Sequence, residues 1–207
     1  MPASHFEFHV EEPSMKAFLG VLLPSILPEN CTFGIYNYQG KSALLRKLEN
    51  RLKAYSYMKH MPINYRIVVI VDRDRDDCKE LKSRLEQICN NAGLRSRQAV
   101  GSTDWQIVTR IAIEELEAWY FGDWQAVQQA YPKVPQHIVN QARYRDSDAI
   151  TGGTWEAFER VLKKHGYFKQ GLSKIQAATA IGKCIDPARN RSRSFASFHA
   201  AITEAST

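Results

Sequence analysis

The sequence lacks any apolar run that could span a bilayer, which takes about 18 residues or more. Its longest apolar stretches are interrupted by Pro24, Pro28 or charged residues. The opening segment, MPASHFEFHVEE, has no basic stretch followed by an apolar one, as a secretion signal would. We therefore expect no membrane partner and a cytoplasmic location for this chain of 207 residues.

Patterned cysteines and histidines are also missing. The four cysteines and six histidines form no CxxC, HxH or HExxH arrangement, which argues against a zinc site and against a disulfide framework. Neither a GxGxxG nor a Walker sequence is present, so a nucleotide-binding or phosphotransfer domain has little support.

Positive charge is in excess and unevenly distributed. The net charge is +6 and the isoelectric point is about 9.1. Basic residues gather between Lys41 and Lys59, at Arg95 and Arg97, and around Arg191. Such clusters attract polyanions such as nucleic acids, although a solvated basic surface is the alternative for each cluster alone.

Strand and helix patterns alternate through the first half of the chain. Residues 66–71 form a continuous β-branched run, typical of a strand buried on both faces of a parallel sheet. Strands at 5–10 and 31–36 and helices from Pro13 to Pro28, from Lys41 to Lys59 and from about Leu81 to Gly93 complete the alternation. This predicts an α/β fold with a central, mostly parallel sheet flanked by helices.

The second half of the chain is mainly helical in pattern. We expect a short strand at 97–100, a strand or a helix entry at 106–113, and a helix over 114–120 that begins with three acidic residues. Helices follow at 124–131, 155–165, 172–184 and 195–203, with a mobile loop near 146–153. The expected organisation is an α/β domain over 1–125 and a helical C-terminal extension over 126–207 packed on it.

Acidic residues stand at the ends of two predicted strands. Glu11 is the first residue after one strand, and Asp72 and Asp74 follow the most buried one. Because ligands of open α/β sheets bind beyond the carboxyl ends of the strands, these carboxylates are expected to converge on a divalent metal, Mg²⁺ or Mn²⁺. The alternative for the DRDRDD run is a solvated helix N-terminus with capping aspartates.

The order of these motifs resembles the topoisomerase/primase (Toprim) fold, in which a glutamate follows the first strand and a DxD a later one. The segments VEEPSMKAFL, VDRDRDDC and IEELEAW more closely resemble a Toprim-like family of uncharacterised bacterial proteins. Members are often encoded beside an ATP-binding cassette type ATPase, and a role in anti-phage defence is suspected for them. The resemblance covers roughly the first 125 residues.

The resemblance implies roles for particular residues. Glu11 would be a general acid/base or a metal ligand, and Asp72 and Asp74 would hold magnesium. Glu12 stands where the family pattern has glycine, which leaves open whether it joins the site. By likeness to the overcoming-lysogenization type nucleases, Glu115 or Glu117 would add a second metal position; on a regular helix only one of the two would face the pocket.

These features together predict a metal-dependent phosphodiesterase, a nuclease acting on DNA or RNA in anti-phage defence. Lys16, Arg73 or Arg75 would neutralise the phosphate, and nucleic acid would follow a set of C-terminal arginines: Arg189, Arg191 and Arg193. The partners implied are nucleic acid, a neighbouring ATPase and a second copy of the chain. The alternative is a Toprim-like subunit without catalysis that binds or regulates an ATPase, as the missing glycine at position 12 suggests.

Overall fold

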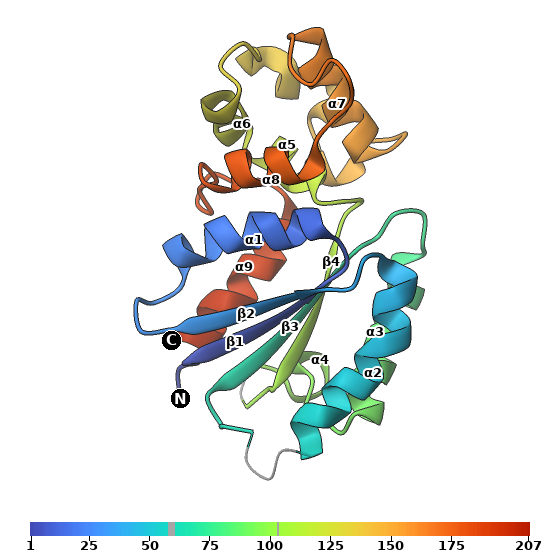
Figure 1. Cartoon of the computed structure of the whole chain (residues 1–207), viewed down its shortest axis with the longest axis vertical. Coiled ribbons are helices and arrows are strands. Elements are labelled where there is room, and N and C mark those ends of the chain that lie inside the picture. Colours follow the sequence, from blue (N-terminus) through green and yellow to red (C-terminus); the bar gives the residue numbers. More distant parts are fainter. Residues whose placement is uncertain (58–60, 103) are drawn as a thin grey trace.

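The computed structural model of the chain describes residues 1–57, 61–102 and 104–207. Its centre is a sheet of four parallel strands in the order β2-β1-β3-β4, with helices on both faces (Figure 1). This is the predicted α/β architecture, consistent with a Toprim-like fold. The strands are β1 (His5–Val10), β2 (Thr32–Asn37), β3 (Tyr65–Asp72) and β4 (Ile107–Ala112).

Helices connect the strands and form the second half of the chain. The helices are α1 (Pro13–Ile26), α2 (Lys41–Tyr57), α3 (Cys78–Asn91), α4 (Arg97–Val100), α5 (Glu117–Gly122), α6 (Trp124–Ala130), α7 (Thr154–Lys164), α8 (Lys174–Gly182) and α9 (Arg193–Ser206). Three short 3₁₀ helices lie between α6 and α7: η1 (Gln136–Asn140), η2 (Ala142–Tyr144) and η3 (Ser147–Ala149). No helix among the described residues combines the length and the apolar character needed to cross a membrane.

The central strand β3 contributes to two separate cores, as its continuous apolar run predicts. Val68 and Ile70 pack with α1 and α9 on one face of the sheet. Ile67, Val69 and Val71 pack with α2 and α3 on the other. Because successive side chains of a strand point to opposite faces, only a strand that is apolar at every position can fill both cores.

The helices α5 to α8 form a lobe beyond the sheet, and α9 then returns to it (Figure 1). In α9, Phe195 and Phe198 pack on Trp119 of α5, with ring centroids 5.3 Å away in each case. Gly182 of α8 has no side chain where an added Cβ would lie 2.7 Å from Val21, so α8 can approach α1 closely. The helical part therefore shares one core with the face of the sheet that α1 covers.

Two local predictions are wrong. Residues 97–100 form the short helix α4 instead of a strand, because the side chain of Ser96 accepts a hydrogen bond from the Ala99 N–H and so caps a helical turn. The helix expected over 114–120 begins only at Glu117.

The structure tests two other local expectations only in part. The expected end of the helix at Lys59 lies outside the described residues, since α2 is described to Tyr57. The loop near 146–153 contains η3, and Asp148 in η3 accepts hydrogen bonds from the first N–H groups of α9.

Candidate functional site

Glu11 and Asp72 lie side by side at the carboxyl edge of the sheet. Their strands β1 and β3 are hydrogen-bonded neighbours, and Glu11 Oε2 accepts a hydrogen bond of 3.2 Å from the backbone N–H of Asp72. Glu11 is 7% exposed and Asp72 8%. Asp72 Oδ1 is buried and finds no hydrogen-bond partner among the described residues. Two segments that are far apart in the sequence thus deliver buried carboxylates to one place.

The two carboxylates have unusual pKa values because of this crowding. Burial raises the pKa of Glu11 to about 7, although the positive charge of Lys41 opposes the rise. The pKa of Asp72 lies well above its ordinary value, first because of burial and then because of the negative charges of Glu11 and Glu117. A bound cation would lower both pKa values, because the charge of Lys41 offsets only part of the rise for Glu11.

Asp74 is held by a lysine that the sequence patterns did not single out. Lys41 Nζ lies 2.7 Å from Asp74 Oδ2 and 2.7 Å from Asp76 Oδ2, and it donates to the Arg73 carbonyl oxygen at 3.1 Å. Burial alone would lower the pKa of Lys41, but its hydrogen bonds with the two aspartates leave it raised. The ammonium group of Lys41 therefore balances Asp74 and Asp76.

The carboxylate oxygens of this site are the kind of ligand that a hard divalent cation prefers, although they are not already arranged around one position. Within residues 1–57, 61–102 and 104–207, no three His, Cys, Asp or Glu side chains are arranged as a metal-binding group. Mg²⁺ is commonly bound by one or two carboxylates and otherwise by water and substrate phosphate. Glu11 and Asp72, with the unpaired Oδ1 of Asp72, meet that smaller requirement.

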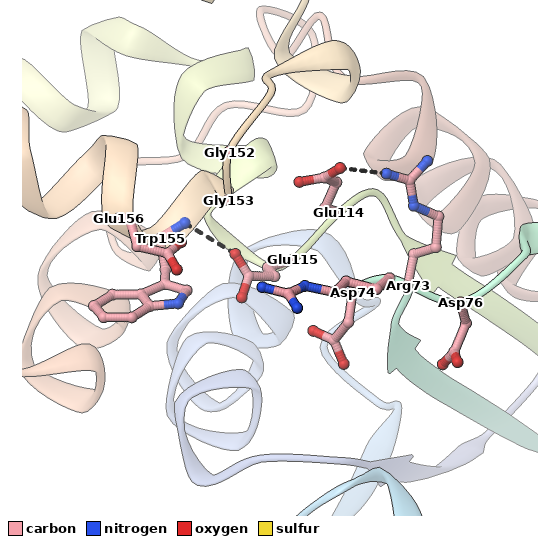
Figure 2. A pocket seen from close by; sticks show the side chains of 10 residues that line it. Arg73, Asp74, Asp76, Glu114, Glu115, Gly152, Gly153, Trp155 and Glu156 are labelled. Atoms are coloured by element: carbon pink, nitrogen blue, oxygen red, sulfur yellow. Dashed lines mark hydrogen bonds and ion pairs between the residues drawn. The ribbon is translucent and has the colours of Figure 1, made fainter.

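The acidic residues of the 114–117 segment have three different surroundings. Glu117 is 2% exposed, and burial raises its pKa to about 7. Glu115 Oε2 accepts hydrogen bonds from Thr154 Oγ1 at 2.8 Å and the Trp155 N–H at 2.9 Å, so it caps the start of α7. Glu114 pairs with Arg73, as Figure 2 shows. Because Glu114 and Glu115 precede the helix, the rule for a regular helix does not apply to them.

Glu12 and Lys174 add a negative and a positive charge to the carboxylate cluster, and Lys174 belongs to the helical lobe. Lys174 Nζ lies 3.7 Å from Glu12 Oε2. Burial lowers the pKa of Lys174, but the charges of Glu117, Glu12, Glu115 and Asp72 outweigh burial and raise it. Glu12, which stands where the family pattern has glycine, thus contributes negative charge to the cluster.

A pocket of about 480 Å³ opens beside Asp74 and Glu115, between the carboxyl edge of the sheet and the start of α7; Glu11 and Asp72 are not among its lining residues. In Figure 2, Gly152, Gly153 and Trp155 of the helical lobe lie on one side of the pocket and Arg73 lies on the other. Glu115 and Asp74 lie between them. Arg75, exposed, also lines the pocket. The pocket is large enough for a phosphate group with part of a nucleotide.

The remaining predicted residues are scattered. Lys16 is exposed on α1, and no described side chain forms a hydrogen bond or ion pair with its amine. Arg189 donates to both carboxylate oxygens of the buried Asp123 and pairs with Asp186, which ties the C-terminal loop to α5 and α6. Arg191 is exposed, and Arg193 pairs with Asp146. The structure brings together Glu11, Glu12, Asp72, Asp74, Glu117 and Arg73, and leaves Lys16 and Arg189 outside.

Lys41 and Lys174 are the residues that sequence reasoning missed. Lys41 follows the turn after β2, and β2 is the other neighbour of β1. The rule that selected Glu11 and Asp72, the carboxyl ends of adjacent parallel strands, would have selected Lys41 as well. Lys174 is 163 residues from Glu11 in sequence, and no local pattern marks it.

Fold and site together define a parallel α/β protein with a buried pair of carboxylates at the carboxyl edge of its sheet. The family described as "Domain of unknown function (DUF4276)" matches residues 10–203, and the chain belongs to this family. No curated protein and no solved structure matches the chain.

Proposed function

We propose that this protein is a metal-dependent phosphodiesterase that acts on nucleic acid through a Toprim-like centre. The observation that carries the proposal is the adjacent pair Glu11 and Asp72, buried together with no direct ion pair to a described residue. Burial of like charges is costly unless a ligand or metal repays it. Perturbed carboxylates in a cleft are typical of functional sites.

Glu11 and Asp72 are the residues that would hold Mg²⁺ or Mn²⁺. When bound, the cation would supply Lewis-acid stabilisation for the charge that develops on the phosphate oxygens. Asp74 is kept in position by Lys41 and could join from there. Burial raises the pKa of Glu117 to about 7, so this carboxyl is only partly ionised at neutral pH, and a nearby cation would favour its ionised form.

The chain also supplies cations of its own for a phosphate. Lys41 and Lys174 lie on opposite sides of the carboxylates, one at the start of α2 and one at the start of α8. Arg73 and Arg75 line the adjacent pocket. This mixture of a negative metal pocket and surrounding positive charge suits a phosphodiester substrate.

The test is cleavage of labelled DNA and RNA by the full chain with Mg²⁺ or Mn²⁺. We expect Asp72→Asn to lower the rate by about a thousandfold, since loss of a metal ligand removes several kcal/mol of transition-state stabilisation. Glu29→Gln is the matched control, because Glu29 is an exposed carboxylate in the loop before β2 and should leave the rate unchanged. Equal rates for the wild type and Asp72→Asn would refute the proposed site.

The second candidate is a non-catalytic subunit that binds or regulates an ATPase in anti-phage defence. It is favoured by the lack, among the described residues, of a ready group of three metal ligands. Absence of cleavage by the pure protein, both alone and with an ATPase encoded beside it, would support this second function. Cleavage that depends on Asp72 would exclude it.

A further inference from the structure

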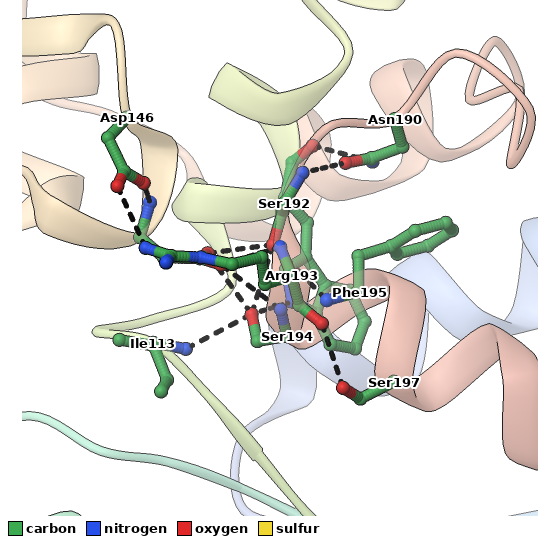
Figure 3. A network of polar contacts seen from close by, with 10 residues as sticks. Ile113, Asp146, Asn190, Ser192, Arg193, Ser194, Phe195 and Ser197 are labelled. Atoms are coloured by element: carbon green, nitrogen blue, oxygen red, sulfur yellow. Dashed lines mark hydrogen bonds and ion pairs between the residues drawn. The ribbon is translucent and has the colours of Figure 1, made fainter.

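A second depression runs along the open edge of β4, outside the carboxylate site. Its volume is about 470 Å³, and it lies between the start of α3, the edge strand β4 and the start of α9. Figure 3 shows Arg193, Ser194 and Ser197 of α9 next to Ile113, the residue after β4. The residues that line it include four basic side chains and one acidic side chain, Asp148. The depression therefore carries an excess of positive charge.

Arg110 is the cation in this depression that has no carboxylate in a direct ion pair among the described residues, although the charges of Glu204 and Glu86 act on it from farther away. Its Nε donates to the Ser197 carbonyl oxygen at 3.0 Å and its Nη1 to the Thr109 carbonyl oxygen at 3.1 Å, and it forms no ion pair with a described residue. Burial, together with the nearby charge of Arg97, lowers its pKa to about 10. The other basic residues that line the depression have carboxylate partners: Arg73 has Glu114, Lys82 has Glu86 and Arg193 has Asp146.

The depression adjoins the pocket beside Asp74, because the two share a lining residue. Arg73 lines both this depression and the pocket beside Asp74. At the other end, Arg193 lines both this depression and a third one of about 310 Å³, which Arg145 and Arg191 also line. We call this row of arginines and one lysine the basic track: Arg73, Lys82, Arg110, Arg193, Arg145 and Arg191.

A polyanion fits the basic track better than a single small anion does. Arg73 and Arg193 are each shared by two of the three depressions, so the charges of the track are spread along a path that starts in the pocket lined by Asp74. Phosphates of one strand repeat at regular intervals, and each cation that contacts one adds to affinity by releasing counterions. The apolar part of the lining, to which Ile111 and Ile113 contribute, offers a surface beside the charges for sugar or base.

We propose that the basic track binds successive phosphates of a nucleic acid strand whose reacting phosphate lies at Glu11 and Asp72, with Arg110 as its central contact. This inference rests on the proposed function for the position of the reacting phosphate. It assigns binding to Lys82, Arg110 and Arg145, which no sequence pattern indicated, and leaves Arg189 to its structural pairing with Asp123.

The test is the binding of a fluorescent single-stranded oligonucleotide, DNA or RNA, to the full chain in EDTA, where metal-dependent cleavage is absent. We expect Arg110→Gln and Arg193→Gln each to weaken binding by about tenfold, the loss of one charge-assisted contact. Each should also reduce the slope of log affinity against log salt by about one. Arg160→Gln, an exposed arginine on α7 away from the track, is the control of equal charge change and should bind as the wild type does.

Two further measurements make the outcome unambiguous. Because Arg110 donates hydrogen bonds to carbonyl groups of β4 and α9, thermal unfolding should be used to check that Arg110→Gln folds. The side chain of Arg193 is 75% exposed, so its replacement does not disturb a core. A labelled mononucleotide should bind weakly to all variants, because it cannot reach along the track. Equal losses for mononucleotide and oligonucleotide, or unchanged affinity and salt slope in both variants, would overturn the proposal.

The proposal that the basic track binds nucleic acid and the proposal of catalysis at Asp72 can be rejected independently of each other. Asp72→Asn should bind the oligonucleotide in EDTA as tightly as the wild type or more tightly, because it removes a negative charge. Track-dependent binding without any cleavage would reject the phosphodiesterase and retain the track. Asp72-dependent cleavage with no effect of Arg110→Gln or Arg193→Gln on binding would do the reverse.

Discussion

Two buried glutamates of this protein, Glu11 and Glu86, are nearly equal in exposure, at 7% and 8%, and opposite in electrostatics. Glu86 Oε1 accepts hydrogen bonds from Lys82 Nζ at 2.8 Å and Thr109 Oγ1 at 2.5 Å. Burial alone would raise the pKa of Glu86, but hydrogen bonds from Lys82, Ser96 and Thr109 leave it lowered. Glu11, beside Asp72, has a pKa raised to about 7. Burial by itself therefore does not decide the pKa of a carboxylate; the hydrogen bonds and charges that face it do.

The largest effect that tests this comparison is expected for Glu117, which is buried in the same cluster as Glu11 and Asp72. Its pKa of about 7, against an ordinary 4.5, means that the folded protein holds a proton there that the unfolded chain releases. The contribution of Glu117 to the stability of the wild type should therefore fall as pH rises from about 4.5 through about 7, and change no further above that. Glu117→Gln removes this loss and should be more stable than the wild type by at most about 3 kcal/mol at about pH 8.

The measurement is urea unfolding of both proteins in EDTA at several pH values. Near pH 4.5 the two free energies of unfolding should agree, because a protonated glutamate and a glutamine are alike in shape and charge. Glu29→Gln should follow the wild type throughout. A Glu117→Gln variant less stable than the wild type at high pH would mean that the charge of Glu117 is well paired, contrary to the comparison.

Glu86→Gln should have the opposite consequence at neutral pH. It leaves Lys82 partly buried without its charged partner, so we expect a loss of about 2 kcal/mol, typical of a hydrogen bond to a charged group. For a chain of this size that corresponds to a drop in Tm of about 6 °C. Calorimetry gives the Tm, and the cleavage rate at a temperature where both proteins are folded should be unchanged. A stable but inactive Glu86→Gln would place Glu86 in the functional site.

The smallest expected effect is stabilisation by Mg²⁺. Metal ligands must be deprotonated, so Mg²⁺ competes with the proton on Glu11 and should raise Tm more at about pH 8 than at about pH 5.5. At a concentration tenfold above the dissociation constant the gain is about 1.4 kcal/mol. Asp72→Asn should abolish the Mg²⁺-dependent shift in a thermal scan, and Glu86→Gln should keep it. An identical shift in all three proteins would indicate binding elsewhere.

Much of the fold could be predicted because it depends on neighbouring residues. The β-branched run at 66–71 can only be a strand buried on both faces, and Pro13 suits the first turn of a helix. The strand predicted at 97–100 was wrong because the capping side chain of Ser96 outweighed β-propensity over four residues. The acidic start of a helix was misplaced because Glu114 and Glu115 pair with Arg73 and with the start of α7, contacts that no local pattern reveals.

The sequence alone determined the alternation of strands and helices, and with it the positions of Glu11 and Asp72 at strand ends, since hydrophobic periodicity is a property of adjacent residues. Only the tertiary structure decided which charges are balanced. Lys41 reaches Asp74, Lys174 approaches Glu12, and Arg110 forms no ion pair with a described carboxylate, because segments more than thirty residues apart meet there. Electrostatic free energy depends on such distances and on burial, which a linear pattern does not contain.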